Sequence, residues 1–95
     1  MSTLRIETKG PVAVVRLDKA RGNSIDEPLT RDLTEATRKL GGDPAVRGVL
    51  LTSAHPKLFS PGLDLVTLIE LDRPAMERFM LQFAEMVWAL YGLPK

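Results

Sequence analysis

The chain has 95 residues, of which 44% are hydrophobic and 26% charged, and its formal net charge is +1. This balance is typical of an ordinary globular domain and gives no sign of a nucleic-acid partner. The absence of cysteine excludes a disulfide framework, a thiolate nucleophile and cysteine-ligated metal.

The N-terminus carries no signal of secretion. Met1–Arg5 is followed by no apolar core of a signal peptide, and no stretch approaches the about 20 apolar residues that span a bilayer. We therefore expect a cytoplasmic protein with no membrane partner.

The first elements predicted are two strands in an antiparallel hairpin. Residues 4–9 alternate, with Leu4, Ile6 and Thr8 on a covered face, and residues 12–17 form a nearly continuous β-branched run. Gly10-Pro11 separates the two, and a turn this short favours pairing of neighbouring strands. Residues 18–25 are polar and predict a loop.

A helix is predicted next, with Asp26 as its N-cap and Pro28 in its first turn. Its apolar stripe consists of Leu29, Leu33, Ala36 and Leu40. Gly41-Gly42 should end it by supplying a left-handed residue.

Residues 46–53 predict a parallel inner strand, because Val49, Leu50 and Leu51 in succession indicate burial on both faces. Strand, helix and strand would then form a crossover unit, in which ligands gather beyond the carboxyl ends of the strands. The loops 18–25 and 54–64 both leave such ends, so we expect them to meet.

The remaining chain predicts a short helix over 64–71 and a longer one capped by Asp72 and ended by Gly92 and Pro94. The longer helix has an apolar stripe formed by Met76, Phe79, Met80, Phe83, Val87, Leu90 and Tyr91. With only three strands, the sheet would expose an edge unless another strand or subunit covered it.

The turn at Ser60-Pro61-Gly62-Leu63 is the strongest candidate for chemistry, because amides at a strand-to-helix junction lack intrahelical partners and can bind an oxyanion. A tight connection without a ligand is the alternative. Asp64 suits a helix cap better than a general base, and Ser60 lacks the surroundings of a hydrolase nucleophile.

Basic and polar side chains in the two loops leave further alternatives open. Lys19, Arg21 and Lys57 are candidates for binding a phosphate, or are simply solvated surface cations. His55 is the single histidine, and with no partner identifiable from the sequence it reads as a solvent-facing loop residue. The methionines and phenylalanines of the long helix could line an acyl pocket, but such a stripe at helical spacing is more typical of an ordinary core.

Two ordered motifs resemble those of the crotonase, or enoyl-CoA hydratase/isomerase, superfamily. Residues 18–25, after their strand, are similar to the family's Asn-Arg-Pro-x-x-Asn-Ala-Leu, with Ala20 in place of Pro and Ser24-Ile25 in place of Ala-Leu. Residues 59–65 are similar to Phe-(Ser/Cys/Ala)-Ala-Gly-x-Asp-(Leu/Ile), with Pro61 in place of Ala. The second motif is especially similar to that of mitochondrial-type Δ3,Δ2-enoyl-CoA isomerases.

The resemblance implies an α/β, crotonase-like fold of ββα repeats in a partial spiral, of which residues 1–95 would be the truncated N-terminal portion of a single domain. It implies an enzyme of fatty acid metabolism, a lyase or isomerase, that stabilises a thioester enolate in an oxyanion hole during hydration or double-bond isomerisation of enoyl-CoA. The backbone N–H of Leu63 would be one donor, and a glycine beyond Lys95 the other. The residues implied in binding coenzyme A are Lys19, Arg21, Asn23, Ser24, Ser60, Pro61, Gly62, Leu63, Asp64 and Leu65.

No cofactor is implied beyond coenzyme A as part of the substrate, and full-length members assemble as trimers or hexamers. The acidic residues that move protons would also lie beyond Lys95, so we expect the 95-residue chain alone to be inactive. The alternative is a non-catalytic truncated module that binds coenzyme A or associates with other subunits.

Overall fold

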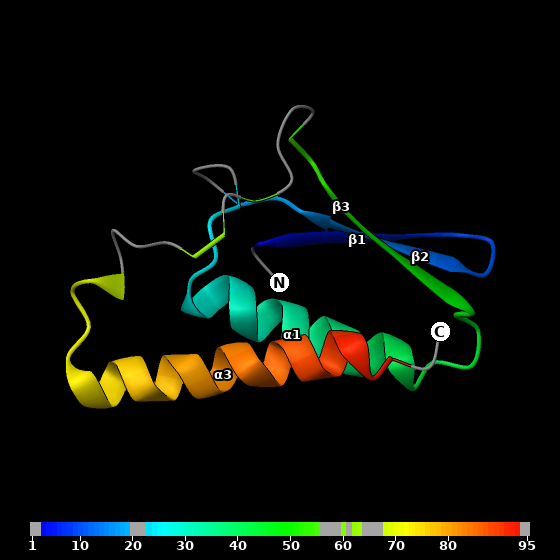
Figure 1. Cartoon of the computed structure of the whole chain (residues 1–95). Helices are drawn as coiled ribbons and strands as arrows, with labels where there is room; N and C mark the ends of the chain where they lie inside the picture. The colour runs from blue at the N-terminus through cyan, green and yellow to red at the C-terminus, as the bar shows by residue number, and fades with distance from the viewer. Residues whose placement is uncertain (1–2, 20–22, 56–59, 61, 64–67, 94–95) are drawn as a thin grey trace.

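The computed structural model describes residues 3–19, 23–55, 60, 62–63 and 68–93, which form a three-stranded sheet with two long helices (Figure 1). The elements in chain order are β1 (Leu4–Lys9), β2 (Val12–Leu17), α1 (Glu27–Gly41), β3 (Gly48–Ser53) and α3 (Arg73–Tyr91). Both helices lie on the same side of the sheet, with α1 next to the strands and α3 packed against α1.

The predicted hairpin and crossover are confirmed. β1 and β2 are antiparallel, with Leu4 opposite Leu17 and Lys9 opposite Val12, and Gly10 in the turn has a φ of 60°. β2 and β3 are parallel, with Val12 opposite Gly48 and Leu17 opposite Ser53. The carboxyl ends of β2 and β3 therefore lie side by side, which positions the loops that follow them.

Two expectations about strand burial are wrong. The sheet order is β1-β2-β3, so β2 is the inner strand and β3 is an outer one among the described residues. Val49 and Leu51 pack against the core, but Leu50 is 54% exposed, because alternation along the strand places it on the opposite face of the sheet. Ile6 in β1 is also exposed, at 42%.

Helix α1 begins as its sequence predicts. The carboxylate of Asp26 accepts a hydrogen bond from the Leu29 amide at 3.1 Å, and Pro28 lies in the first turn. The predicted stripe is buried in full, from Leu29 at 1% exposure to Leu40 at 8%. The expected left-handed end is wrong, because the C-cap Gly42 has a φ of −90° and its N–H donates to the Arg38 carbonyl in an ordinary right-handed turn.

Helix α3 also begins at its predicted cap, with the Asp72 carboxylate accepting from the Ala75 amide at 2.9 Å. Phe79 and Met86 are buried, but Met80, Val87 and Tyr91 of the predicted stripe are 44%, 46% and 83% exposed. The reason is that α3 packs mainly against α1, so only a narrow side of it is covered. Residues 64–67 of the predicted short helix lie outside the described residues.

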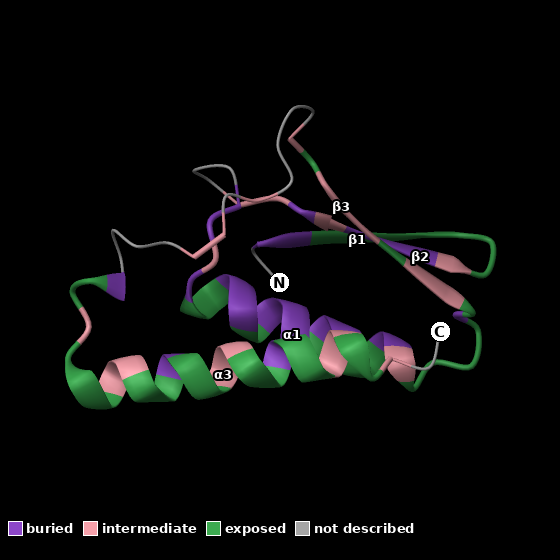
Figure 2. Cartoon of the chain, in the orientation of Figure 1, coloured by how far each residue is buried: buried purple, intermediate pink, exposed green. Residues whose placement is uncertain are grey.

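The core lies between the sheet and α1 (Figure 2). Its buried members come from both strands of the hairpin, α1, the turn before β3 and α3: Leu4, Ala13, Val15, Leu17, Leu29, Leu33, Ala36, Leu40, Val46 and Met86. Thr3 ties the start of β1 to α1, since its N–H and hydroxyl both donate to the Asp32 carboxylate. Neither of the two long helices in the described part of the chain has the length and hydrophobicity required to cross a membrane.

Candidate functional site

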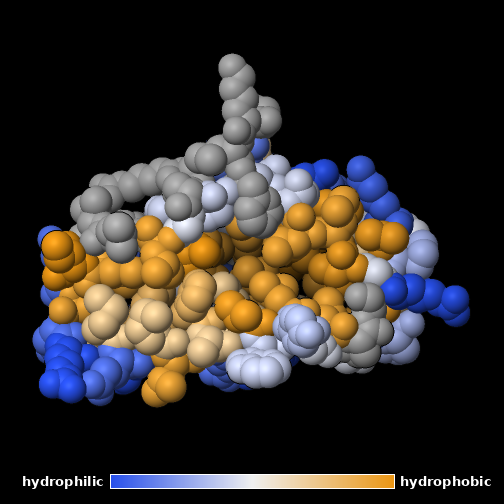
Figure 3. Space-filling view, viewed as in Figure 1, coloured by the Kyte–Doolittle hydropathy of each residue, from blue (hydrophilic) through white to orange (hydrophobic). Residues whose placement is uncertain are grey.

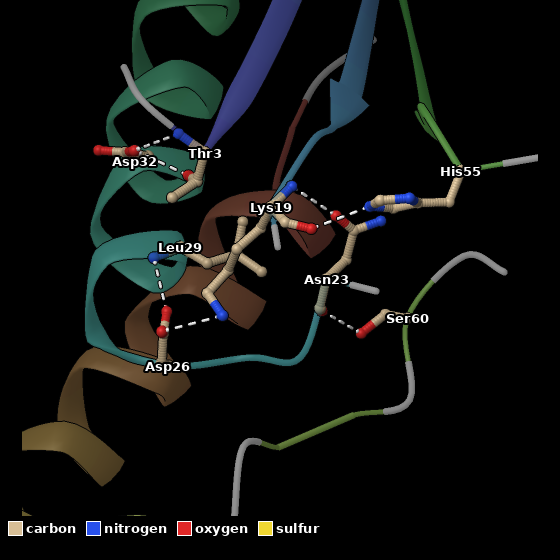
Figure 4. A network of polar contacts seen from close by, with 8 residues as sticks. All are labelled: Thr3, Lys19, Asn23, Asp26, Leu29, Asp32, His55 and Ser60. Carbon is tan, nitrogen blue, oxygen red and sulfur yellow. Dashed lines mark hydrogen bonds and ion pairs between the residues drawn. The ribbon is translucent and has the colours of Figure 1, made fainter. Parts of the chain in front are cut away.

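The two loops predicted to meet lie together at the carboxyl ends of β2 and β3 (Figure 4). The Ala54 amide donates to the Leu17 carbonyl at 2.9 Å, which extends the parallel pairing past the end of β3. The site is built from three short segments at this edge: the loop after β2, the residues after β3, and the turn around residues 60–63.

Asn23 joins the first two segments. Its side chain accepts a hydrogen bond from the Lys19 amide at 2.8 Å through Oδ1 and donates to the Ser53 hydroxyl at 2.8 Å through Nδ2. The residue is fully buried and has a φ of 69°, a left-handed conformation that asparagine tolerates better than most residues.

Ser60 and Gly62 are attached to the same loop. The Ser60 hydroxyl donates to the Asn23 carbonyl at 2.7 Å and accepts from the Gly62 amide at 3.2 Å. The Ile25 amide donates to the Gly62 carbonyl at 2.6 Å, and Ile25 pairs with Leu63 in an isolated parallel bridge. Gly62 has a φ of 97°, which favours glycine.

These contacts fix the direction of the Leu63 amide. The Gly62 carbonyl and the Leu63 N–H belong to one planar peptide unit, and no cis peptide bond occurs among the described residues. In a trans unit the two groups point in opposite directions. With the carbonyl held by Ile25, the Leu63 N–H points away from the loop after β2, and no described residue accepts a hydrogen bond from it.

Lys19 is engaged in the site through its own ammonium group. Its Nζ lies 3.1 Å from Oδ2 of Asp26, and the two side chains are only 14% and 12% exposed. Asp26 is also the N-cap of α1, so one carboxylate serves both the helix and the lysine. A phosphate bound by Lys19 would have to compete with Asp26, and the phosphate role stays a prediction.

His55 has partners that the sequence did not reveal. Its amide donates to the Ser53 hydroxyl at 2.9 Å, and its Nε2 lies 2.9 Å from the Lys19 carbonyl oxygen. Because a carbonyl only accepts, Nε2 carries the proton in this contact. His55 therefore has the partners that the sequence did not identify, while its side chain stays partly exposed. No local signal could have found the contact, since the two residues are 36 positions apart.

The other predicted residues divide into two groups. Ser24 is buried, at 8% exposure. Arg21, Lys57, Pro61, Asp64 and Leu65 lie outside the described residues. Among the residues that the structure describes, no group of three histidine, aspartate or glutamate side chains is placed to hold a metal ion.

Sequence comparison places these features in one family. Residues 7–95 match the enoyl-CoA hydratase/isomerase family pattern. The chain is 43% identical over 63 residues to the mouse mitochondrial enoyl-CoA delta isomerase 1, which covers 64% of this chain and 22% of the relative. It is 33% identical over 72 residues to carnitinyl-CoA dehydratase of Salmonella arizonae, which covers 76% of this chain and 28% of the relative.

The fold agrees with this comparison. All of the chain superposes on 37% of the crystal structure of an enoyl-CoA hydratase/carnitine racemase from Magnetospirillum magneticum, with a TM-score of 0.91 at 24% identity. The predicted α/β, crotonase-like fold is therefore confirmed. The chain spans less than a third of the length of the two curated relatives. It belongs to the enoyl-CoA hydratase/isomerase family.

Proposed function

We propose that this chain supplies the acyl-CoA-binding, carbonyl-polarising part of an enzyme that hydrates or isomerises enoyl-CoA. The observation that carries the proposal is the Leu63 N–H, which is held by its peptide unit in an outward direction and has no acceptor among the described residues. The relatives whose names mention an enoyl-CoA isomerase and a carnitinyl-CoA dehydratase support a CoA thioester as the ligand class.

The chemistry follows from a fixed donor at the position where negative charge develops. The thioester carbonyl oxygen would accept the hydrogen bond from Leu63, which weakens the C=O bond and stabilises the enolate formed when a neighbouring C–H loses its proton. A preorganised donor of this kind contributes about 2.7–4 kcal/mol to the transition state. It costs little at the moment of reaction, because the Ile25–Gly62 hydrogen bond holds the peptide unit beforehand.

The rest of the coenzyme would lie against the two loops, with its phosphates near Lys19 and Arg21 and its adenine near the turn of residues 60–63. We assign two roles to parts of a complete family domain outside these 95 residues: the group that removes the proton, and the second hydrogen-bond donor to the carbonyl oxygen. We therefore propose that the isolated chain binds acyl-CoA without turning it over. A cytoplasmic location and assembly into homo-oligomers belong to the same proposal.

Titration of the chain with acetoacetyl-CoA, with free coenzyme A as the control ligand, tests this function. We expect acetoacetyl-CoA to bind more tightly than coenzyme A, and the thioester C=O stretch of the bound ligand to move to lower frequency. Undetectable binding of acetoacetyl-CoA, or an unshifted carbonyl in the bound state, would overturn the proposal.

A second candidate function is a module that associates with other chains through its sheet. It is favoured by the position of β3, which pairs with β2 along one edge and whose other edge has no strand partner among the described residues. The exposed Leu50 on this strand is an apolar contact suited to a neighbouring subunit. Sedimentation equilibrium measures such association directly.

A further inference from the structure

We propose that Asn23 is a positioning residue that sets the direction of the Leu63 N–H, and that it does not contact coenzyme A. This inference rests on the proposed function for its catalytic meaning. Asn23 is fully buried, and both ends of its side-chain amide are hydrogen-bonded, to the Lys19 amide and the Ser53 hydroxyl. A ligand could reach this side chain only by opening the loop that the side chain closes.

The side chain of Asn23 anchors its own backbone. It ties the loop after β2 at one end to Lys19 and at the other to the end of β3. Figure 4 shows the side chain pointing toward Lys19 and His55, while the contact from Ser60 reaches the backbone of Asn23. The left-handed φ of 69° lets the side chain of Asn23 bind the ends of β2 and β3 while its carbonyl accepts the hydrogen bond from Ser60.

From this anchor, two connections run to Gly62, whose carbonyl belongs to the peptide unit that carries the Leu63 N–H. One passes from the Asn23 carbonyl to the Ser60 hydroxyl and on to the Gly62 amide. The other starts two residues along the chain, where the Ile25 amide holds the Gly62 carbonyl at 2.6 Å. Gly62 is therefore held at both its N–H and its C=O by groups whose positions depend on Asn23, and Leu63 shares the second of these peptide units.

A buried asparagine could also serve stability alone, and the two roles differ in where the effect appears. Loss of general stability would speed hydrogen exchange of amides throughout the core. Loss of positioning would speed exchange at the Ile25 amide, which is protected by its bond to Gly62, more than at core amides such as that of Val15. The ratio of the two exchange rates separates these roles without any ligand.

The experiment compares Asn23→Gly with Asn23→Asp in the full chain by amide hydrogen exchange. Glycine accepts the left-handed backbone but makes neither side-chain bond. Aspartate still accepts from the Lys19 amide, and the Ser53 hydroxyl can donate to it. We expect Asn23→Gly to lower the protection of Ile25 relative to Val15 at least about fivefold, in line with the loss of two hydrogen bonds, and Asn23→Asp to keep it within about twofold.

Thr37→Ala is the matched control. Its buried hydroxyl donates to the Leu33 carbonyl within α1, away from the loops, so its loss should leave the Ile25-to-Val15 ratio unchanged. Unchanged relative protection in Asn23→Gly, or an equal loss in Thr37→Ala, would overturn the positioning role.

The carbonyl stretch of bound acetoacetyl-CoA supplies the second readout. We expect its shift to be smaller in Asn23→Gly than in the unaltered chain and restored in Asn23→Asp; an undiminished shift in Asn23→Gly would overturn the link to Leu63. If the unaltered chain fails to bind the thioester while the exchange ratios behave as expected, the proposed function fails and the structural inference about Asn23 stands.

Discussion

Two residues of the candidate site, Asn23 and Gly62, have positive φ angles. Their conformations allow the loop after β2 and the turn at 60–63 to exchange the hydrogen bonds that leave the Leu63 N–H free of acceptors among the described residues. The proposed chemistry depends on backbone direction at these residues, so we expect the substitutions with the largest effect to be those that change φ.

Gly62→Ala tests the backbone requirement, with Gly10→Ala as a matched control. Both glycines have positive φ, 97° and 60°, and at neither would an added Cβ meet another atom within 4 Å. Each substitution should therefore cost about 1–2 kcal/mol of folding free energy for conformational reasons alone. Thermal unfolding measures this cost.

The two variants should differ in ligand binding. We expect Gly62→Ala to weaken acetoacetyl-CoA binding about tenfold, because the Leu63 peptide unit moves, and Gly10→Ala in the β1–β2 turn to leave the dissociation constant unchanged. Equal affinities for the two variants would contradict a role for the Gly62 conformation in the site.

Both long helices begin with an aspartate N-cap, but the surroundings of the two caps differ. Asp26 and Asp72 each cap an amide three residues later. Asp72 is exposed, whereas Asp26 is 9% exposed and also holds the Lys19 ammonium. The cap of α1 is thus part of the candidate site, and that of α3 is not.

Replacement of the caps measures this difference. Asp72→Ala should cost about 1 kcal/mol, the usual contribution of an exposed N-cap. Asp26→Ala should cost at least about 2 kcal/mol, because it also removes the carboxylate from a largely buried ammonium. Urea unfolding of both variants checks the order.

Asp26→Asn separates the two contributions of this carboxylate. It keeps an oxygen for the Leu29 amide but removes the charge that faces Lys19, so its stability should fall between those of the unaltered chain and Asp26→Ala. A cost for Asp26→Ala no greater than that for Asp72→Ala would rule out a significant contribution from the lysine.

As a whole molecule, the chain presents much hydrophobic surface. The exposed large side chains come from the sheet, the segment before α3, and α3: Ile6, Leu50, Ile69, Met80, Leu81, Val87, Trp88 and Tyr91. Figure 3 shows hydrophobic side chains gathered across the face toward the viewer, between the strands and α3. Surface of this extent favours association with further polypeptide.

Sedimentation equilibrium of the isolated chain should reveal concentration-dependent association. We expect Leu50→Lys to weaken it at least about fivefold, because a lysine on an outer strand opposes strand addition. Leu81→Lys, at a position 71% exposed on α3, is the matched control and should have a smaller effect. A purely monomeric chain would contradict the association module, and a larger effect of Leu81→Lys would move the contact from the sheet to the helix.

The elements themselves were largely predictable. Alternating apolar and polar residues and a Gly-Pro pair predicted the hairpin. An aspartate before each apolar helical stripe predicted the N-cap of each long helix. The motif at residues 59–65 predicted the family that the comparisons confirm. These predictions were correct because each depends on residues close together in the sequence, for which the side-chain periodicity of strands and helices and the geometry of helix caps are fixed.

Burial and partners were less predictable. The sequence did not distinguish the covered side of α3 from the exposed Val87 and Tyr91, because an apolar stripe does not say how much of it a neighbour covers. Nor did it distinguish an outer β3 from an inner one, since both can carry consecutive apolar residues.

By itself, then, the sequence determined the local elements, the family and the turn that carries Leu63. Only the tertiary structure decided how this turn is held: the bonds from Asn23 to Ser53 and from Ser60 to Asn23 join residues 30 and 37 positions apart. Such contacts exist because parallel pairing of β2 and β3 brings their carboxyl ends together. The direction of the Leu63 N–H thus depends on the Ile25–Gly62 hydrogen bond, which this pairing makes possible, together with the positive φ of Gly62 beside it in the chain.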